Sequence, residues 1–250
     1  MTLALAVGDA LRVLADIPSD TIGAVIADPP YSSGGAFRGD RTGPRTGVKY
    51  VSSDSPRRFL PDLEGDTRDQ RGYLAWSTLW MAEARRVLMP GCAIVVFTDW
   101  RQLPTTTDAV QAAGFVWRGV AVWDKTQGRP GPGFSTGQTE FMVWGTKGAN
   151  GLHHVHHRGV LSARIEREER DHHQTPKPVA LLRRLCELAP PGSVVLDPFT
   201  GSGSTLVAAH NAGRDALGVE ITKEYATRAR ARVQAEAEQY ALFSDLTGDS

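Results

Sequence analysis

Short apolar runs rich in valine alternate along this chain with longer segments in which apolar residues recur at helical spacing. This alternation is typical of strand and helix units that build a mostly parallel sheet with helices on both faces. We expect strands at residues 22–27, 92–99, 193–199 and 216–220, helices at 73–88, 178–189, 204–213 and 223–240, and an antiparallel edge hairpin of 115–125 with 140–147. The pattern therefore predicts an α/β fold.

The length of 250 residues, with 41% hydrophobic content, suits one large domain with a sizeable core. We place this domain at residues 1–236 and a C-terminal tail at 237–250. Two stretches, 32–72 and 149–173, fit no long element, and the second holds six of the seven histidines. Loops of this length in a compact domain are usually functional or disordered. The mixed charge of residues 158–170 suits one short helix.

Composition excludes several classes of protein. The formal net charge is zero, so the chain is no global polycation, and any nucleic-acid surface must be local. Cys92 and Cys186 lie far apart in apolar patterns without a CxxC spacing, which indicates buried thiols in a reducing cytosol.

The histidines lack the spacing and partners of a zinc site, so we expect no metal. The N-terminus has no secretion signal and no apolar run spans a membrane, so we expect a cytoplasmic protein.

The stretch Asp28-Pro29-Pro30-Tyr31 directly follows a predicted buried strand. The carboxyl ends of strands in open α/β sheets are where ligands bind. The two prolines stiffen this loop, so a fixed carbonyl and the Asp28 carboxylate offer two acceptors to one amino group. Tyr31 supplies a flat face on which a planar heterocycle can stack. The alternative is an ordinary strand-ending turn, because Asp-Pro and Pro-Pro are common turn formers.

A second motif follows the strand at residues 193–199. Gly201 and Gly203 allow a tight turn at the start of a helix, so that the backbone can approach a ligand closely. Glu220 ends the next strand, near the offset at which an acid binds ribose hydroxyls in nucleotide-binding units. The third glycine of a dinucleotide site and the lysine of a phosphate-binding loop are both missing. An adenosine ligand without pyrophosphate fits better, and S-adenosylmethionine is the common one.

Together, DPPY at residues 28–31 and DPFTGSGST at 197–205 resemble the β group of prokaryotic DNA amino-methyltransferases. The order of the motifs is specific, because the catalytic half precedes the cofactor half in that group. Further matching segments, among them WDK at 123–125, EFMVWGTKG at 140–148 and TPKPVALLRRL at 175–185, extend the resemblance over nearly the whole chain. It implies the Rossmann-like fold of S-adenosylmethionine-dependent methyltransferases and methyl transfer to the exocyclic amine of a flipped DNA base.

The resemblance also implies roles for individual residues. The tetrapeptide Asp28, Pro29, Pro30 and Tyr31 would be catalytic. The cofactor would contact Asp197, Phe199, Gly201, Gly203, Glu220, Thr175 and Lys177. The DNA would contact Asp9, Tyr31, Trp123 and Lys125. Independently of the resemblance, the basic residues Arg38, Arg41 and Arg45 in the loop after Tyr31 are candidates for contacts to DNA phosphates, and the alternative is an ordinary solvated loop, because the loop also contains acids.

Several of these residues have structural alternatives. Asp9 suits an N-cap, and Thr175 and Lys177 stand where a proline-containing helix start is expected. Trp123 suits packing, and Glu140 is either an interior polar partner or an ordinary charge at the end of a strand.

The aspartate that begins the tetrapeptide is more typical of N6-adenine than of N4-cytosine enzymes in this family. Adenine is therefore the expected target, with N4-cytosine as the alternative. An RNA or protein methyltransferase and a non-catalytic DNA-binding module are further alternatives. The resemblance implies double-stranded DNA as partner, without a membrane, and admits a homodimer and a cognate restriction endonuclease in a prokaryotic or phage-infected cell.

Overall fold

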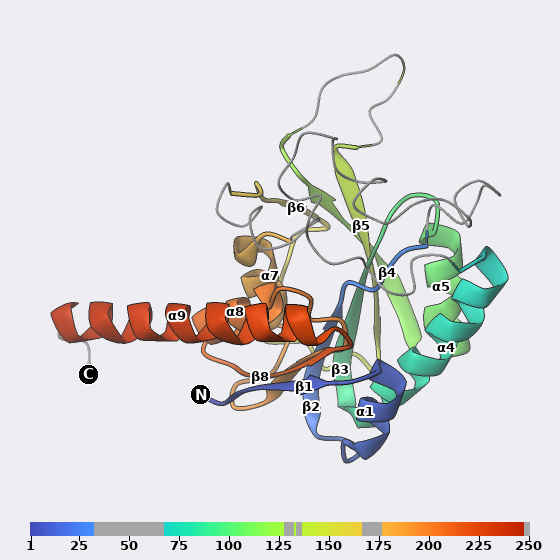
Figure 1. Cartoon of the computed structure of the whole chain (residues 1–250). Helices are drawn as coiled ribbons and strands as arrows, with labels where there is room; N and C mark the ends of the chain where they lie inside the picture. Colours follow the sequence, from blue (N-terminus) through green and yellow to red (C-terminus); the bar gives the residue numbers. More distant parts are fainter. Residues whose placement is uncertain (33–67, 128–132, 134–136, 167–176, 248–250) are drawn as a thin grey trace.

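The computed structural model describes residues 1–32, 68–127, 133, 137–166 and 177–247. Its centre is a sheet of eight strands in the order β1-β8-β7-β2-β3-β5-β4-β6 (Figure 1). The strands are β1 (Leu3–Val7), β2 (Ile22–Ala27), β3 (Leu88–Thr98), β4 (Val116–Asp124), β5 (Thr139–Thr146), β6 (Val160–Ser162), β7 (Val194–Asp197) and β8 (Asp215–Glu220). Pairings from β1 to β3 are all parallel, and β5 pairs antiparallel with both β3 and β4.

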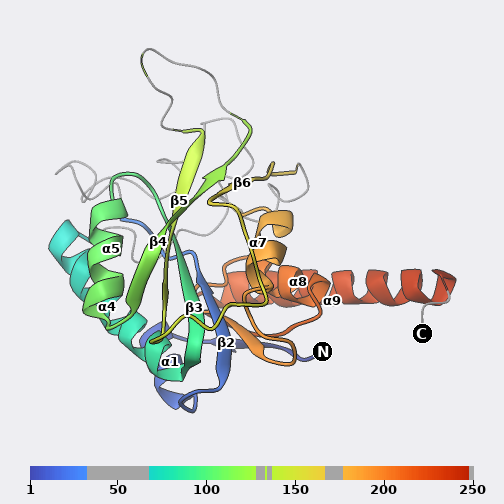
Figure 2. The ribbon, with the colours of Figure 1, turned by 180° about the vertical axis from the view of Figure 1, so that it is seen from behind.

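Helices cover both faces of this sheet, as the views from the front and from behind show (Figures 1 and 2). One face carries α1 (Ala10–Asp16), α4 (Gln70–Val87) and α5 (Leu103–Ala112), and the other carries α7 (Val179–Cys186), α8 (Ser204–Asn211) and α9 (Lys223–Thr247). The strands supply both cores by alternation. In β3, Ile94 and Val96 pack towards α4, whereas Val95 and Phe97 pack towards α7.

The predicted fold class is confirmed, with all four expected strands and all four expected helices present. The antiparallel pair of β4 and β5 is also confirmed, but it does not form the edge, because β6 pairs with β4 on its outer side. The short helix expected at residues 158–170 is wrong in its described part, where Val160–Ser162 is a strand. The backbone pairing with β4 outweighs the weak helical preference of this mixed-charge stretch. The extent of the domain at residues 1–236 stays a prediction.

Among the described residues, four elements lie outside the strands and helices expected above: β1, α1, β6 and α5, of which α1 was anticipated only by the N-cap alternative for Asp9. The helix α9 continues to Thr247, past its predicted end near Tyr240, and its carboxyl-terminal half extends away from the body of the protein (Figures 1 and 2). Both cysteines are free and buried, as expected. In the described part of the chain, every helix is too short or too polar to cross a membrane.

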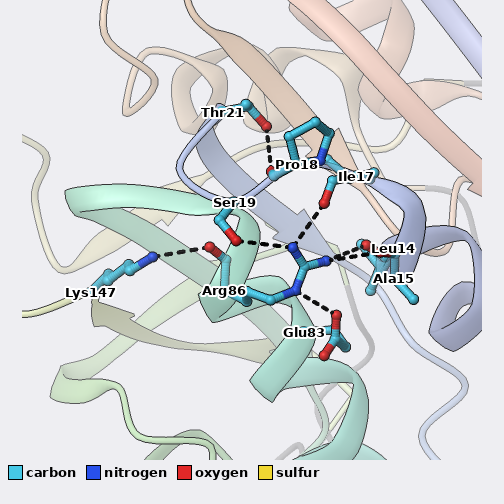
Figure 3. A network of polar contacts seen from close by, with 9 residues as sticks. All are labelled: Leu14, Ala15, Ile17, Pro18, Ser19, Thr21, Glu83, Arg86 and Lys147. Atoms are coloured by element: carbon cyan, nitrogen blue, oxygen red, sulfur yellow. Dashed lines mark hydrogen bonds and ion pairs between the residues drawn. The ribbon is translucent and has the colours of Figure 1, made fainter.

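At the amino-terminal edge of the sheet, Arg86 ties α4 to the end of α1 (Figure 3). Its Nη2 donates to the Leu14 carbonyl at 2.8 Å, and its Nη1 donates to the Ile17 carbonyl at 2.9 Å. The Nε group donates to Glu83 at 2.8 Å, and Lys147, which follows β5, donates to the Arg86 carbonyl at 3.0 Å. The Leu14 carbonyl also accepts from the Ile17 amide, so the bonds from Arg86 add to the backbone capping at the end of α1 and tie this helix to α4.

Candidate active site

The topology brings the two predicted motifs to one edge of the sheet. The strands β2, β7 and β8 are parallel neighbours, so their carboxyl ends lie side by side. Asp28 follows β2, Asp197 ends β7 and Glu220 ends β8. The chain reaches the same edge at the end of β4 and at the start of β5, which adds Lys125 and Glu140. Residues from distant parts of the sequence therefore converge at this edge.

Two carboxylates share the hydroxyl group of Tyr31. This hydroxyl lies 2.8 Å from Asp28 Oδ1 and 3.0 Å from Glu140 Oε2, and it can donate its single hydrogen to only one of them at a time. Asp28 is partly exposed, with 27% of its side chain accessible, and Glu140 is less so at 16%. Tyr31 therefore links the loop after β2 to the start of β5.

Lys177 completes the same cluster from the residue before the α7 N-cap Pro178. It is buried, with 6% exposure, and its Nζ lies 2.6 Å from Asp28 Oδ2 and 3.3 Å from Glu140 Oε2. Lys125 Nζ contacts the other oxygen of Glu140 at 2.8 Å. Two ammonium groups thus face two carboxylates, so the formal charges of the cluster balance around the buried Lys177.

Burial and neighbouring charges together raise the pKa of Asp28 and Tyr31 and lower that of Glu140. Burial raises the pKa of Asp28, against the opposing effect of Lys177. Burial also raises the pKa of Tyr31 to well above its ordinary value, with Asp28 and Glu140 adding to the effect. For Glu140, burial acts to raise the pKa, but Lys177 and Lys125 outweigh it and leave the pKa lowered. At neutral pH, Tyr31 therefore carries its proton and Glu140 is ionised.

The pKa of Lys177 is raised, because the attraction of Asp28 and Glu140 outweighs the burial that would lower it. This lysine is thus a protonated, buried ammonium group whose partners are the two carboxylates. A buried charge of this kind is stable only while it keeps such partners.

The second motif forms a turn that holds two acids. Asp197 is 3% exposed, and its Oδ1 accepts a hydrogen bond from the Phe199 amide at 2.9 Å. Burial raises the pKa of Asp197 to about 7, against the hydrogen bonds that lower it. Glu220 accepts from the Gly201 amide at 2.9 Å and from the Thr222 amide at 2.8 Å. The glutamate is thereby fixed directly beside the glycine turn.

The turn requires glycine at Gly203, the N-cap of α8. Its φ of 86° lies in the left-handed region, and a Cβ atom there would come within 3.1 Å of Ala229 Cβ on α9. Phe199 packs its ring on Trp76 and Trp80 of α4, at centroid distances of 5.4 and 5.0 Å. The glycine turn is therefore supported by packing on both sides.

Of the other predicted site residues, Asp9 and Trp123 have structural roles, and four lie outside the described residues. Asp9 caps α1, since its Oδ1 accepts from the Leu11 amide at 3.1 Å. Trp123 is 1% exposed and donates its indole N–H to the Ala163 carbonyl, so it packs in the core and presents no surface to a ligand. Four further predicted residues lie outside the described residues: Thr175, Arg38, Arg41 and Arg45.

The sequence did not decide whether Glu140 is an interior polar partner or an ordinary charge at the end of a strand. In the structure it is an interior polar partner, in contact with Tyr31, Lys125 and Lys177. The available signal was its place at the start of a strand, beside the hairpin that also carries Lys125. The histidines at 154, 156 and 157 border a hollow of about 540 Å³ against α7, together with Arg183, Arg184 and Glu187. Among the residues that the structure describes, no group of three or more histidine, cysteine or acidic residues is arranged to hold a metal.

The family model for N6 and N4 DNA methylases matches residues 22–231, so the chain belongs to that family. This confirms the resemblance inferred from the motifs and their order.

Two relatives and one solved structure match this chain over most of their own length. YubD of Escherichia coli (strain K12), whose name describes a methylase, is 32% identical over 229 residues, or 91% of this chain and 88% of that protein. The type II methyltransferase M2.DpnII of Streptococcus pneumoniae is 27% identical over 254 residues, or 92% and 89% of the two chains. TTHA0409 of Thermus thermophilus, solved in complex with S-adenosyl-L-methionine, superposes with a TM-score of 0.63 at 25% identity, covering 94% of this chain and 96% of that one.

Proposed function

We propose that this protein transfers a methyl group from S-adenosylmethionine to the exocyclic N6 of adenine in double-stranded DNA. The observation that carries the proposal is the position of Asp28 at the end of β2, next to the Asp197 turn at the end of β7. An amine acceptor and an adenosine-binding turn are thus side by side on neighbouring strands.

The amine on an adenine ring is a weak nucleophile, because its lone pair is delocalised into the ring. Asp28 and the Pro29 carbonyl each accept one N–H bond, which favours a more tetrahedral nitrogen with its lone pair aimed at the methyl group. Alignment and electrostatics thereby lower the barrier. The amine is out of reach inside a duplex, so the base must be flipped, and the ring of Tyr31 offers it a stacking surface.

The residues of the second motif fit the cofactor. Glu220 is held beside the glycine turn by the Gly201 and Thr222 amides, and its carboxylate is the group that would accept the ribose hydroxyls. Gly201 and Gly203 let the backbone approach the bound cofactor closely. Asp197, when ionised, is a suitable partner for the positive charge of the methionine part. S-adenosylmethionine supplies the activated methyl group.

The choice of adenine rests on the aspartate that begins the tetrapeptide, since cytosine presents the same amino group. N4-cytosine is therefore the alternative target within the same mechanism. A homodimer and a partner nuclease remain proposals that follow from the family, as does a cytoplasmic location beside the DNA.

The surface next to the site suits DNA. Trp100 and Arg101 follow β3 at the catalytic edge, and Trp100 is 51% exposed, with the guanidinium of Arg101 centred 5.0 Å from its ring. The next residue, Gln102, donates to the Ser32 carbonyl directly after the tetrapeptide. An exposed aromatic ring beside an arginine offers contacts to bases and phosphates.

The direct test is mass spectrometry of nucleosides from unmethylated DNA after incubation with the protein and S-adenosylmethionine. We expect N6-methyladenine; N4-methylcytosine would keep the mechanism and correct the base. Equal incubations with RNA and with protein test the other substrate classes, and transfer to either one but not to DNA would refute the proposal.

The Asp28→Ala variant tests the mechanism. Transfer should become undetectable, while the Kd for S-adenosylmethionine, measured by calorimetry, stays within about threefold because Asp28 binds the amine. Asp108→Ala, at an exposed carboxylate on α5, is the matched control and should keep full activity. Full activity in Asp28→Ala would exclude this carboxylate from the reaction.

A further inference from the structure

Glu140 duplicates the contacts of the catalytic carboxylate. Tyr31 lies within hydrogen-bonding distance of Asp28 and of Glu140, at 2.8 and 3.0 Å. Lys177 also contacts both acids, at 2.6 and 3.3 Å. Each donor is nearer to Asp28 and has Glu140 as its second acceptor.

This arrangement opposes the proposed chemistry unless the contacts change. The hydrogen bonds from Tyr31 and Lys177 engage both oxygens of Asp28. A carboxylate that already accepts two such bonds polarises a further N–H group less strongly, because its negative charge is partly neutralised. Asp28 is a better acceptor for the base amine after these two donors have moved away.

Moving the donors away is costly if they have no other partner. Lys177 is 6% exposed, so its ammonium group would be left buried and unpaired, and such an uncompensated charge is strongly destabilising. Glu140 removes this cost because it lies within reach of both donors. Lys125 fixes Glu140 through its other oxygen at 2.8 Å, so that Oε2 remains directed at Tyr31 and Lys177.

We propose that Glu140 is a positioning residue that takes over the Tyr31 hydroxyl and the Lys177 ammonium group when Asp28 binds the amine of the target base. The inference rests on the proposed function, because it assigns the exchange of partners to the step in which the base enters. Lys125 supports the exchange by holding Glu140 in place. In this role Glu140 acts through Tyr31 and Lys177.

Single-turnover kinetics of Glu140→Gln test this role, since glutamine keeps the shape and removes the charge. We expect the rate of methyl transfer to fall at least tenfold, while the Kd values for S-adenosylmethionine and DNA change less than threefold. Lys125→Met, which releases Glu140, should lower the rate in the same direction by a smaller factor. Glu187→Gln, at the C-cap of α7 and away from the cluster, is the matched control and should keep the wild-type rate.

A merely structural role of Glu140 would weaken binding and stability along with the rate, so a rate loss confined to the chemical step supports positioning. An unchanged rate in Glu140→Gln would overturn the inference. If that variant does not fold, Lys125→Met decides the question by the same criterion.

A second measurement does not depend on methyl transfer. In Asp28→Asn, Lys177 retains Glu140, and in Glu140→Gln it retains Asp28, but in the double variant it retains neither carboxylate. The melting temperature of the double variant should therefore fall by more than the sum of the two single changes, and an additive result would overturn the shared-donor arrangement. If the wild-type protein methylates no DNA, the proposed function fails, whereas this thermodynamic cycle still tests Glu140.

Discussion

Replacing Asp197 by asparagine tests whether burial raises the pKa of this acid at the end of β7. The pKa of Asp197 lies at about 7 in the folded protein against an ordinary value of 3.8, because burial penalises the charged form. The folded state therefore binds the proton more tightly than the unfolded chain does. The resulting stabilisation is complete below the ordinary pKa and is lost as the pH rises through about 7.

The size of the effect follows from the two pKa values. Each pH unit between them corresponds to about 1.4 kcal/mol, so ionised Asp197 at pH 8 costs about 4 kcal/mol relative to the protonated form. About 2.5 kcal/mol of this loss falls between pH 5 and pH 8. The introduced asparagine would keep the acceptor for the Phe199 amide without ionising. The free energy of unfolding of Asp197→Asn, relative to wild type, should therefore rise by about that amount over this range.

Urea unfolding followed by tryptophan fluorescence at pH 5, 6, 7 and 8 measures this difference. The other ionisable groups are common to both proteins, so they largely cancel in the comparison. A difference in unfolding free energy that stays constant from pH 5 to pH 8 would refute the reasoning. Binding supplies an independent check: if ionised Asp197 meets the cationic cofactor, the affinity for S-adenosylmethionine should rise about tenfold from pH 6 to pH 8 in the wild type only.

Three further substitutions have defined outcomes. Arg86→Ala removes the bonds to the end of α1 and should lower the free energy of unfolding by about 2–3 kcal/mol in a urea titration. Arg228→Ala is the control: it removes an exposed ion pair with Glu224 within α9, and it should change the free energy of unfolding by less than about 0.5 kcal/mol. Gly203→Ala forces a side chain into left-handed backbone against α9, so calorimetry should show weaker binding of S-adenosylmethionine and a lower melting temperature. Trp100→Ala should weaken DNA binding at least fivefold by fluorescence anisotropy, while Trp117→Ala, an exposed tryptophan near the start of β4, leaves it unchanged; equal effects would contradict the assigned DNA face.

The sequence predicted the central strands well, because β2 and β7 are continuous apolar runs that end in an acid. It did not predict β6, whose three residues form a strand only because the backbone of β4 pairs with them. The helix α5 was missed because its sequence, LPTTTDAVQA, is rich in threonine and has a weak apolar pattern. Tertiary pairing and packing determine both elements, and neither is visible in a local window.

The motifs correctly predicted that Asp28 and Asp197 lie at strand ends, because each follows or ends a continuous apolar run. The role of Glu140 was not predictable in the same way. It depends on the pairing of Trp123 with Glu140 across β4 and β5 and on the return of the chain to Lys177 after β6. A charge at the end of a strand has no meaning until its spatial neighbours are known.

The neighbouring positions of β2 and β7 have a consequence for how the protein is made. Ribosomes synthesise β2 long before β7, yet β7 lies between β2 and β8 in the middle of the sheet. A nascent chain that ends before residue 194 has β2 as a bare, hydrophobic sheet edge, which is prone to pairing with other chains. Inserting β7 between β2 and β8 requires contacts between residues far apart in the sequence, and such contacts form slowly. The end of the sheet that carries Asp28 and Asp197 is therefore among the last parts of the protein to be completed, and prematurely terminated chains would be aggregation-prone and would lack the Asp197 turn.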